Sequence, residues 1–257
     1  MKSNQYPSYL NEEYFQIALQ SLDKFSENCQ IFDIKITLCN NNGEGFLSTL
    51  LRVALKYTTK SKIKEISIIL KCGLASTKNA SESQEIQDNE MKFFQKIAPK
   101  MMKIFEKFNE NSKIIPKIIF IDQTNWILIF NDLRLENFKS ADRKVGLDEN
   151  HMKISLKNLA KFHAASLLMD PKEFESFDIG MFSRKSPGFN SLMINLYEAA
   201  IDEISEWNGF EIYAEKMRKL SEFYIENATK CFDLNSKELN VLNHGDVWTT
   251  NLMFKYD

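Results

Sequence analysis

The spacing of the apolar residues changes part-way along this chain, and that change constrains the fold more than any other feature. Before residue 131, several segments alternate between apolar and polar residues, as half-buried β-strands do. Beyond Asp132, apolar residues recur every three or four positions, which is typical of amphipathic helices. We therefore expect an α+β fold with a strand-rich first half and a helical second half.

The strand-rich half also contains two segments with helical spacing, at 12–25 and near 84–97. Strands are predicted at 32–38, 51–57, 65–71, 114–121 and 126–130. In the second half, Met152, Leu156, Leu159, His163 and Leu167 share one helical face, and two more helical patterns follow between residues 192 and 230.

Charge and composition argue against several classes of protein. The formal net charge is −2, whereas binding nucleic-acid phosphates normally needs a concentrated basic face. No apolar run has the length of a membrane span, and residues 1–9 are too polar for a signal peptide. The four cysteines are widely spread without a CxxC pair, which fits reduced thiols. We expect a cytoplasmic protein with no nucleic-acid or membrane partner.

The segment His-Gly-Asp-Val-Trp-Thr-Thr-Asn at 244–251 carries the most specific chemical signal. Asp246 precedes Asn251 by five residues, the spacing at which a carboxylate can take a proton from a substrate hydroxyl while an amide oxygen reaches a phosphate-bound Mg²⁺. We predict that Asp246 is the catalytic base or hydroxyl-orienting group, that Asn251 is a metal ligand, and that His244 braces the loop. Such a loop is typical of small-molecule kinases.

Four segments together resemble the ecdysteroid kinase-like family, also called CHK kinase-like, whose relatives include choline kinases and aminoglycoside phosphotransferases. They are LNHGDVWTTN at 242–251, LAKFHAAS at 159–166, NDL at 131–133 and GEGFLSTLLRV at 43–53. The resemblance implies a protein-kinase-like two-lobe fold. Its N-lobe, residues 1–130, would be an antiparallel five-stranded sheet plus a helix, and residues 131–257 would form an incomplete helical C-lobe.

The resemblance also implies a reaction and its cofactors. ATP and Mg²⁺ would serve the transfer of a phosphoryl group to the hydroxyl of a small molecule, a steroid-like or other lipophilic alcohol. The 20 phenylalanines are compatible with an apolar acceptor pocket, although such residues more often form plain core.

Nucleotide contacts in the first lobe follow from the same resemblance. Gly43 and Gly45 fall at the family's nucleotide-covering turn, and Ser48 follows it, where it could bond a phosphate. An ordinary hairpin turn and a strand-start serine facing water are the alternatives. Lys71, at the end of the predicted third strand, would contact the α- and β-phosphates of ATP, although strand-end lysines are often solvent-exposed.

Glu90 would orient that lysine through an ion pair, with Glu85 as a nearby rival. The segment Asn131–Leu133 would be the hinge, where main-chain groups of Asn131 and Leu133 bond adenine. The family commonly has Glu-Asp-Leu here, so Asn131 departs from the pattern, and an ordinary strand exit is the alternative. His163 is expected to be a buried structural residue near the loop, and His151 is expected at the surface.

One part of the family pattern is missing from these residues. In the family, the strand after the loop pairs with another that carries Asp-Phe-Gln, whose Asp bridges Mg²⁺ to the phosphates. The printed sequence ends at Asp257 without this segment. We therefore expect a fragment or incomplete gene product with little or no kinase activity of its own and a last strand without its hairpin partner. The alternative is a non-catalytic nucleotide- or ligand-binding pseudokinase.

Overall fold

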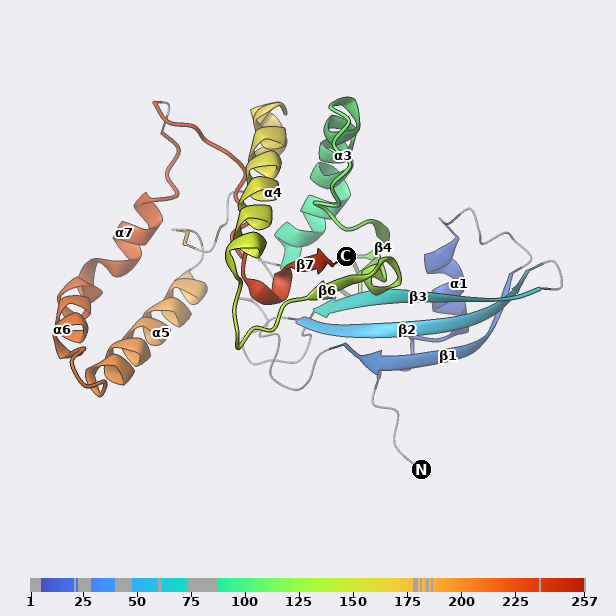
Figure 1. The fold of residues 1–257 in the computed structure, drawn as a ribbon, viewed down its shortest axis with the longest axis horizontal. Coiled ribbons are helices and arrows are strands. Elements are labelled where there is room, and N and C mark those ends of the chain that lie inside the picture. Colours follow the sequence, from blue (N-terminus) through green and yellow to red (C-terminus); the bar gives the residue numbers. More distant parts are fainter. Residues whose placement is uncertain are drawn as a thin grey trace. The chain divides into compact units, whose positions relative to one another are not determined.

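The computed structural model describes residues 6–20, 22, 29–39, 48–59, 62–73, 87–177, 180, 182–183, 185, 187–235 and 237–256 (Figure 1). The chain forms two compact units. The first comprises Met1–Thr77, Met91–Phe162 and Asp246–Asp257, and the second comprises Lys78–Glu90 and His163–Gly245.

An antiparallel sheet of five strands forms the centre of the first unit. The order β1-β2-β3-β5-β4 is built from β1 (Gln30–Leu38), β2 (Ser48–Thr59), β3 (Lys62–Gly73), β4 (Ile118–Asp122) and β5 (Ile127–Asn131). The β2 and β3 strands pair without interruption from Ser48↔Gly73 to Thr59↔Lys62. The predicted antiparallel five-stranded sheet is therefore confirmed.

One face of this sheet is buried by helix α1 (Glu12–Leu19). Asn11 caps the helix, because its side-chain oxygen accepts a bond from the Tyr14 main-chain N–H at 3.0 Å. Phe15, Ala18 and Leu19 enter a core with strand residues that include Val53, Leu55, Ile68 and Ile129. The helix predicted at 12–25 has its last helical residue at Leu19; residues 21 and 23–28 lie outside the described chain.

The opposite face contacts the helical segment that precedes β4. Residues 87–92 are helical and continue through a π-helical turn, η1 (Phe93–Ile97), into α3 (Ala98–Lys107). The Phe94 ring meets the Phe130 ring of β5 edge-on, with centroids 4.9 Å apart. Pro99 lies in the first turn of α3, where its missing N–H costs little, so the helix predicted to end at 97 runs ten residues further.

Several predicted strand boundaries differ from those in the structure, two of them for clear local reasons. β4 begins at Ile118 and not at residue 114, because Pro116 cannot donate to a strand partner. β5 begins at Ile127 because Trp126 has a left-handed backbone with φ +57°, which belongs to the preceding turn. β3 continues past Lys71 to Gly73.

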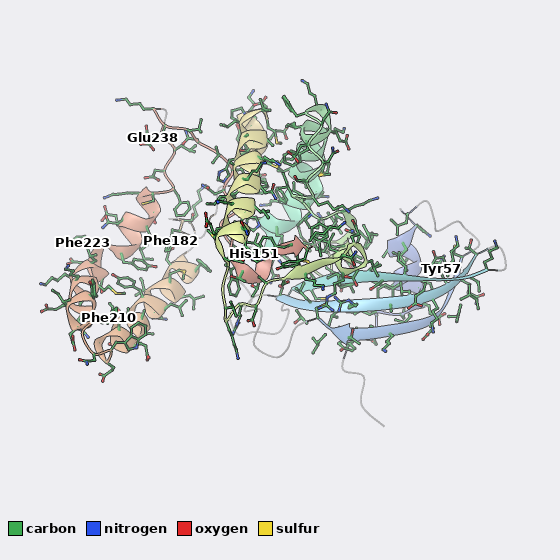
Figure 2. The ribbon with its side chains drawn as sticks, in the orientation of Figure 1. Tyr57, His151, Phe182, Phe210, Phe223 and Glu238 are labelled. Atoms are coloured by element: carbon green, nitrogen blue, oxygen red, sulfur yellow. The ribbon has the colours of Figure 1, made fainter. Side chains whose placement is uncertain are left out.

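Helices dominate the second half, as predicted. They are α4 (Glu149–Leu167), α5 (Pro187–Ser205), α6 (Glu211–Leu220) and α7 (Tyr224–Lys230), with 3-10 turns η3 (Pro171–Phe174) and η4 (Ser221–Phe223). In the second unit, α5 contacts α6 and α7, and the Tyr197 and Tyr224 rings stack with centroids 4.1 Å apart. The Phe182 ring meets Tyr224 edge-on (Figure 2).

The apolar face predicted for α4 coincides only in part with the side of the helix that is buried. Met152, Leu156 and Leu167 are exposed. The helix instead buries Phe162, Ala165 and Ser166 near its C-terminal end. Helical spacing of apolar residues therefore identified the helix, but it did not identify the buried side.

A small second sheet was not predicted from the sequence. Strand β6 (Phe138–Ser140) pairs antiparallel with β7 (Met253–Lys255), from Phe138↔Lys255 to Ser140↔Met253. It follows a 3-10 turn, η2 (Leu133–Glu136). The strand after the His-Gly-Asp loop therefore pairs along one edge with β6, which is a different strand from the hairpin partner that the family pattern implies.

Candidate active site

The Asp246–Asn251 segment folds back on itself. Gly245 precedes it with φ +79°, a conformation that residues with side chains rarely adopt. The 3-10 turn η5 (Thr249–Asn251) then returns the chain toward Asp246. Nδ2 of Asn251 donates to the Asp246 main-chain oxygen at 3.0 Å and to its Oδ2 at 2.6 Å. The structure thus places side by side the two side chains that the sequence spacing singled out.

The orientation of the Asn251 amide bears on its predicted use as a metal ligand. Because Nδ2 faces the carboxylate, Oδ1 is directed away from it. Both side chains are exposed. Mg²⁺ takes oxygen ligands and is commonly bound by one or two carboxylates together with phosphates and water. Within the described residues no cluster of three His, Cys, Asp or Glu side chains could hold a metal ion. Of the two side chains, the Asn251 amide oxygen is the donor that fits a Mg²⁺ shared with a phosphate ligand, because the Asp246 carboxylate faces the amide nitrogen.

Strand β6 connects this loop to the predicted hinge. It pairs with β7 and lies against both η2, which follows the hinge, and η5, which contains Asn251 (Figure 1). All these elements belong to the first unit. The turns η2 and η5, which follow the predicted hinge and contain the predicted metal ligand, therefore each lie next to β6 of one small sheet.

The hinge residues leave β5 in a defined conformation. Asn131 donates its main-chain N–H to the Lys117 carbonyl at 3.3 Å. Asp132 is extended, with φ −79° and ψ 101°, and caps η2 by accepting the Arg134 N–H at 3.1 Å. The N–H of Leu133, as the first of this turn, has no acceptor inside it. The turn therefore presents a main-chain donor of the kind that adenine recognition needs.

Asp132 is itself a buried carboxylate, only 5% exposed. Its Oδ2 accepts Nε of Arg52 at 2.8 Å and Oγ of Ser67 at 2.7 Å. Burial raises the pKa of Asp132, but the bonds from Arg52, Ser67 and the Arg134 amide outweigh burial and hold the pKa below its usual value. The sequence analysis assigned no role to the side chains of Arg52, Ser67 or Asp132. The one sequence feature that could have indicated this cluster is Arg52, a charged residue within an otherwise apolar stretch of β2.

Lys71 and Ser48 both lie in described strands. Lys71 is half-buried in β3, opposite Leu50 of β2 and Leu128 of β5. Since its neighbour Leu70 points into the core, Lys71 points to the other face of the sheet. Ser48 opens β2 opposite Gly73.

The other predicted nucleotide contacts are less fully placed. Gly43 and Gly45 lie outside the described residues. Glu90 lies in the helical residues 87–92 and belongs to the second unit, whereas Lys71 belongs to the first, so their ion pair stays a prediction. In the segment with His163, Ser166 accepts the Leu242 N–H at 3.1 Å and so connects α4 to the residues before the loop.

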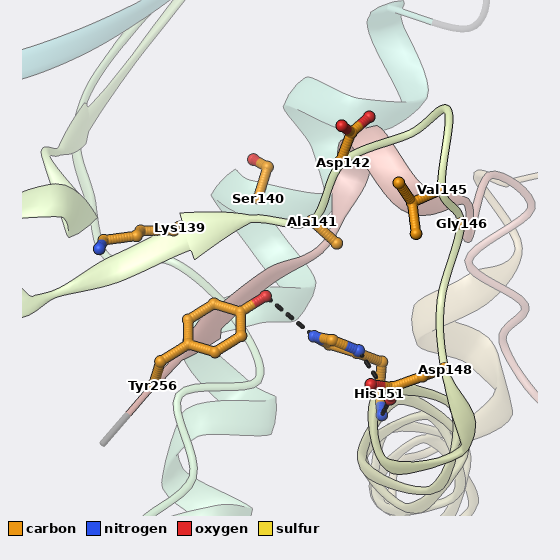
Figure 3. Close-up of a pocket in the computed structure, with 9 residues that line it drawn as sticks. All are labelled: Lys139, Ser140, Ala141, Asp142, Val145, Gly146, Asp148, His151 and Tyr256. Atoms are coloured by element: carbon orange, nitrogen blue, oxygen red, sulfur yellow. Dashed lines mark hydrogen bonds and ion pairs between the residues drawn. The ribbon is translucent and has the colours of Figure 1, made fainter.

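His151 is not the surface residue that the sequence predicted. It borders an open hollow of about 440 Å³, which is also lined by residues 139–142, 145–146 and 148 and by Tyr256 (Figure 3). Its Nδ1–H donates to Asp148 at 2.8 Å, and its Nε2 bonds the Tyr256 hydroxyl at 2.9 Å. The ring also meets Phe254 edge-on at 4.5 Å, and the side chain is 18% exposed. His151 therefore fastens the end of β7 to α4.

Replacing His151 by alanine is expected to loosen β7. The change removes two hydrogen bonds and a ring contact, so we expect the free energy of unfolding to fall by about 1–3 kcal/mol. Amide hydrogen exchange of Met253–Lys255 should accelerate with it. The control is Lys153→Ala, an exposed position one half-turn along the same helix. Unchanged exchange in β7 would show that the Asp148–His151–Tyr256 chain does not hold the strand.

A sheet with this order, a hinge-like exit from β5 and a paired Asp and Asn after the helices define a kinase-like α+β protein. The family model for the Ecdysteroid kinase-like family matches residues 42–257, and the chain belongs to this family. Membership implies a small-molecule phosphotransferase of the kinase-like class, which generally uses ATP and Mg²⁺.

Other comparisons add little to this assignment. A search of curated proteins and a search of solved structures each gave no match. Among the helices that the structure describes, none combines the length and hydrophobicity needed to cross a membrane. The four cysteines all lie in described residues, and none of them forms a disulfide there.

Proposed function

We propose that this chain carries the nucleotide and metal site of an ATP-dependent phosphotransferase that acts on the hydroxyl of a small lipophilic alcohol in the cytoplasm. The observation that carries the proposal is the contact between Asp246 and Asn251 in an exposed loop of an ecdysteroid kinase-like protein. The steroid-like nature of the acceptor rests on the family resemblance alone.

The loop residues divide the chemistry between them. Asp246 would orient the acceptor hydroxyl and take its proton as the hydroxyl oxygen attacks the γ-phosphorus of ATP, while the bond to the β,γ-bridging oxygen breaks and ADP leaves. Asn251, through Oδ1, would hold Mg²⁺, which when bound offsets the charge of the phosphates. The 2.6 Å bond fixes the amide in the orientation that frees its oxygen. Positioning of this kind supplies much of the catalysis in phosphoryl transfer.

The remaining predicted residues would bind the nucleotide. Lys71 would contact the α- and β-phosphates, with Glu90 orienting its ammonium group. The carbonyl of Asn131 and the N–H of Leu133 would bond the adenine edge. Gly43, Gly45 and Ser48 would cover the phosphates through main-chain N–H groups and a hydroxyl.

A second candidate function is a nucleotide-binding relative without turnover. One observation favours it: among the described residues no group of three His, Cys, Asp or Glu side chains could hold a metal ion. A site with so few metal-binding side chains would bind Mg²⁺·ATP more readily than it would stabilise the charge of a transferring phosphoryl group.

Thermal unfolding with and without Mg²⁺·ATP, together with a product assay, tests both candidates. Saturation at a hundred times the dissociation constant would add about 2.7 kcal/mol of stability. Lys71→Met should reduce that gain, whereas Lys64→Met, an exposed lysine on the same strand, should not. Labelled phosphate appearing on hydroxylated steroids or choline supports the phosphotransferase. Binding without product supports the second candidate, and no binding contradicts both.

A further inference from the structure

The charged cluster at the hinge is the feature that the proposed chemistry has not used. It joins three segments distant in sequence: Arg52 of β2, Ser67 of β3 and Asp132 after β5. Arg52 and Asp132 are 80 positions apart. Such a cluster costs free energy unless every charge is compensated, so its presence in a strand-rich interior needs a reason.

Strand register explains how these side chains meet. Val53 and Ile68 pair and point into the core, so their neighbours Arg52 and Ser67 point to the opposite face. Ile68 also pairs with Asn131, and the antiparallel register therefore places the following residue, Asp132, beside Ser67. Lys71 points to this same face of the sheet. The cluster therefore lies on the sheet face that bears the predicted phosphate-binding lysine, at the point where the chain leaves β5.

Both side-chain oxygens and the main-chain oxygen of Asp132 accept hydrogen bonds that stabilise the predicted hinge. Oδ2 takes Arg52 and Ser67, Oδ1 takes the Arg134 N–H, and the main-chain oxygen takes the Leu135 N–H at 3.1 Å. These bonds hold both the side chain and the main-chain carbonyl of Asp132. Asp132 lies between the Asn131 carbonyl and the Leu133 N–H, the two main-chain groups predicted to hydrogen-bond adenine. With Asp132 held, the direction of the Leu133 N–H is set before any ligand arrives.

We propose that Arg52 and Ser67 are positioning residues of the nucleotide site, which act through Asp132 to hold the Asn131–Leu133 main chain in its adenine-binding conformation. The inference rests on the proposed function. Neither side chain needs to touch the nucleotide. Without Arg52, the buried carboxylate loses its counter-charge and moves toward water, and the peptide that it anchors rotates with it.

The test measures nucleotide affinity, turnover and local exchange in the same variants. Arg52→Met is expected to raise the dissociation constant for Mg²⁺·ATP about ten-fold or more, with a smaller effect on kcat, because misplaced binding groups weaken binding first. Amide exchange of Arg134 and Leu135 should accelerate with it. Ser67→Ala should act in the same direction more weakly, since the Arg52 bond remains, and it carries the test if Arg52→Met does not fold.

Two controls separate positioning from general damage. Lys56→Met, on the same strand with an exposed ion pair to Asp33, should leave affinity and exchange unchanged. If Arg52 acts through Asp132, the double variant Arg52→Met/Asp132→Asn should bind ATP no more weakly than Asp132→Asn alone. Additive losses would overturn the inference.

The remaining outcomes distinguish this inference from the proposed function. If the natural protein binds Mg²⁺·ATP and Arg52→Met binds it equally well, or leaves Arg134 exchange unchanged, the positioning role is wrong and the function stands. If the natural protein binds no nucleotide, the proposed function fails and the positioning role fails with it.

Discussion

Replacing Asp246 by asparagine is expected to lower the rate of phosphoryl transfer about a hundred- to ten-thousand-fold, the usual contribution of a general base. The substitution keeps the size of the side chain and an oxygen that can accept the Asn251 bond. It removes the carboxylate that is proposed to take the hydroxyl proton. The dissociation constant for Mg²⁺·ATP should change much less, because the proposed adenine and phosphate contacts involve other residues. Initial rates over a range of acceptor concentrations separate kcat from KM.

The matched control is Asp202→Asn, an exposed carboxylate on α5 that lies 3.9 Å from the Arg218 guanidinium. Its rate should equal that of the natural protein. A rate for Asp246→Asn within ten-fold of the natural protein would remove Asp246 from the role of base. The exposed loop carboxylate would then be left with metal binding or loop structure as its function.

The sequence was sufficient where the signal is local. Alternation in β2 predicted that Leu51, Val53, Leu55 and Tyr57 share one face, and all four are buried. The five-residue spacing from Asp246 to Asn251 likewise closes within one short turn, so the two side chains had to come close. Local hydrophobic pattern and motif spacing need no knowledge of distant partners.

Contacts between residues far apart in the sequence could not be predicted from local patterns. The three residues of β6 have no strand pattern, and their partner strand lies more than a hundred residues along the chain. His151 and Tyr256 are 105 positions apart, so a lone histidine could be interpreted only as exposed. Arg52 and Asp132 show the same limit: each is an ordinary charged residue until the register of β2, β3 and β5 brings them together.

Phe15→Ala in α1 is expected to lower the free energy of unfolding by about 3–5 kcal/mol, the cost of removing a buried phenylalanine from a well-packed core. The ring is fully buried and meets Tyr14 edge-on at 5.4 Å. It belongs to the cluster that includes Leu19, Ile31 and Val53. Denaturant titration of the purified protein, followed by circular dichroism, measures the change.

This result bears on which residues make up the domain. The family match begins at residue 42, whereas α1 and β1 come before it and complete one face and one edge of the sheet. The control, Ile17→Ala on the same helix, is 53% exposed, and its stability should stay within about 0.5 kcal/mol of the natural protein. A large loss for Phe15→Ala with no loss for Ile17→Ala would make α1 part of the unit that contains the five-stranded sheet. Equal and small losses would mean that α1 does not pack on the sheet, and that the part matched by the family model folds without it.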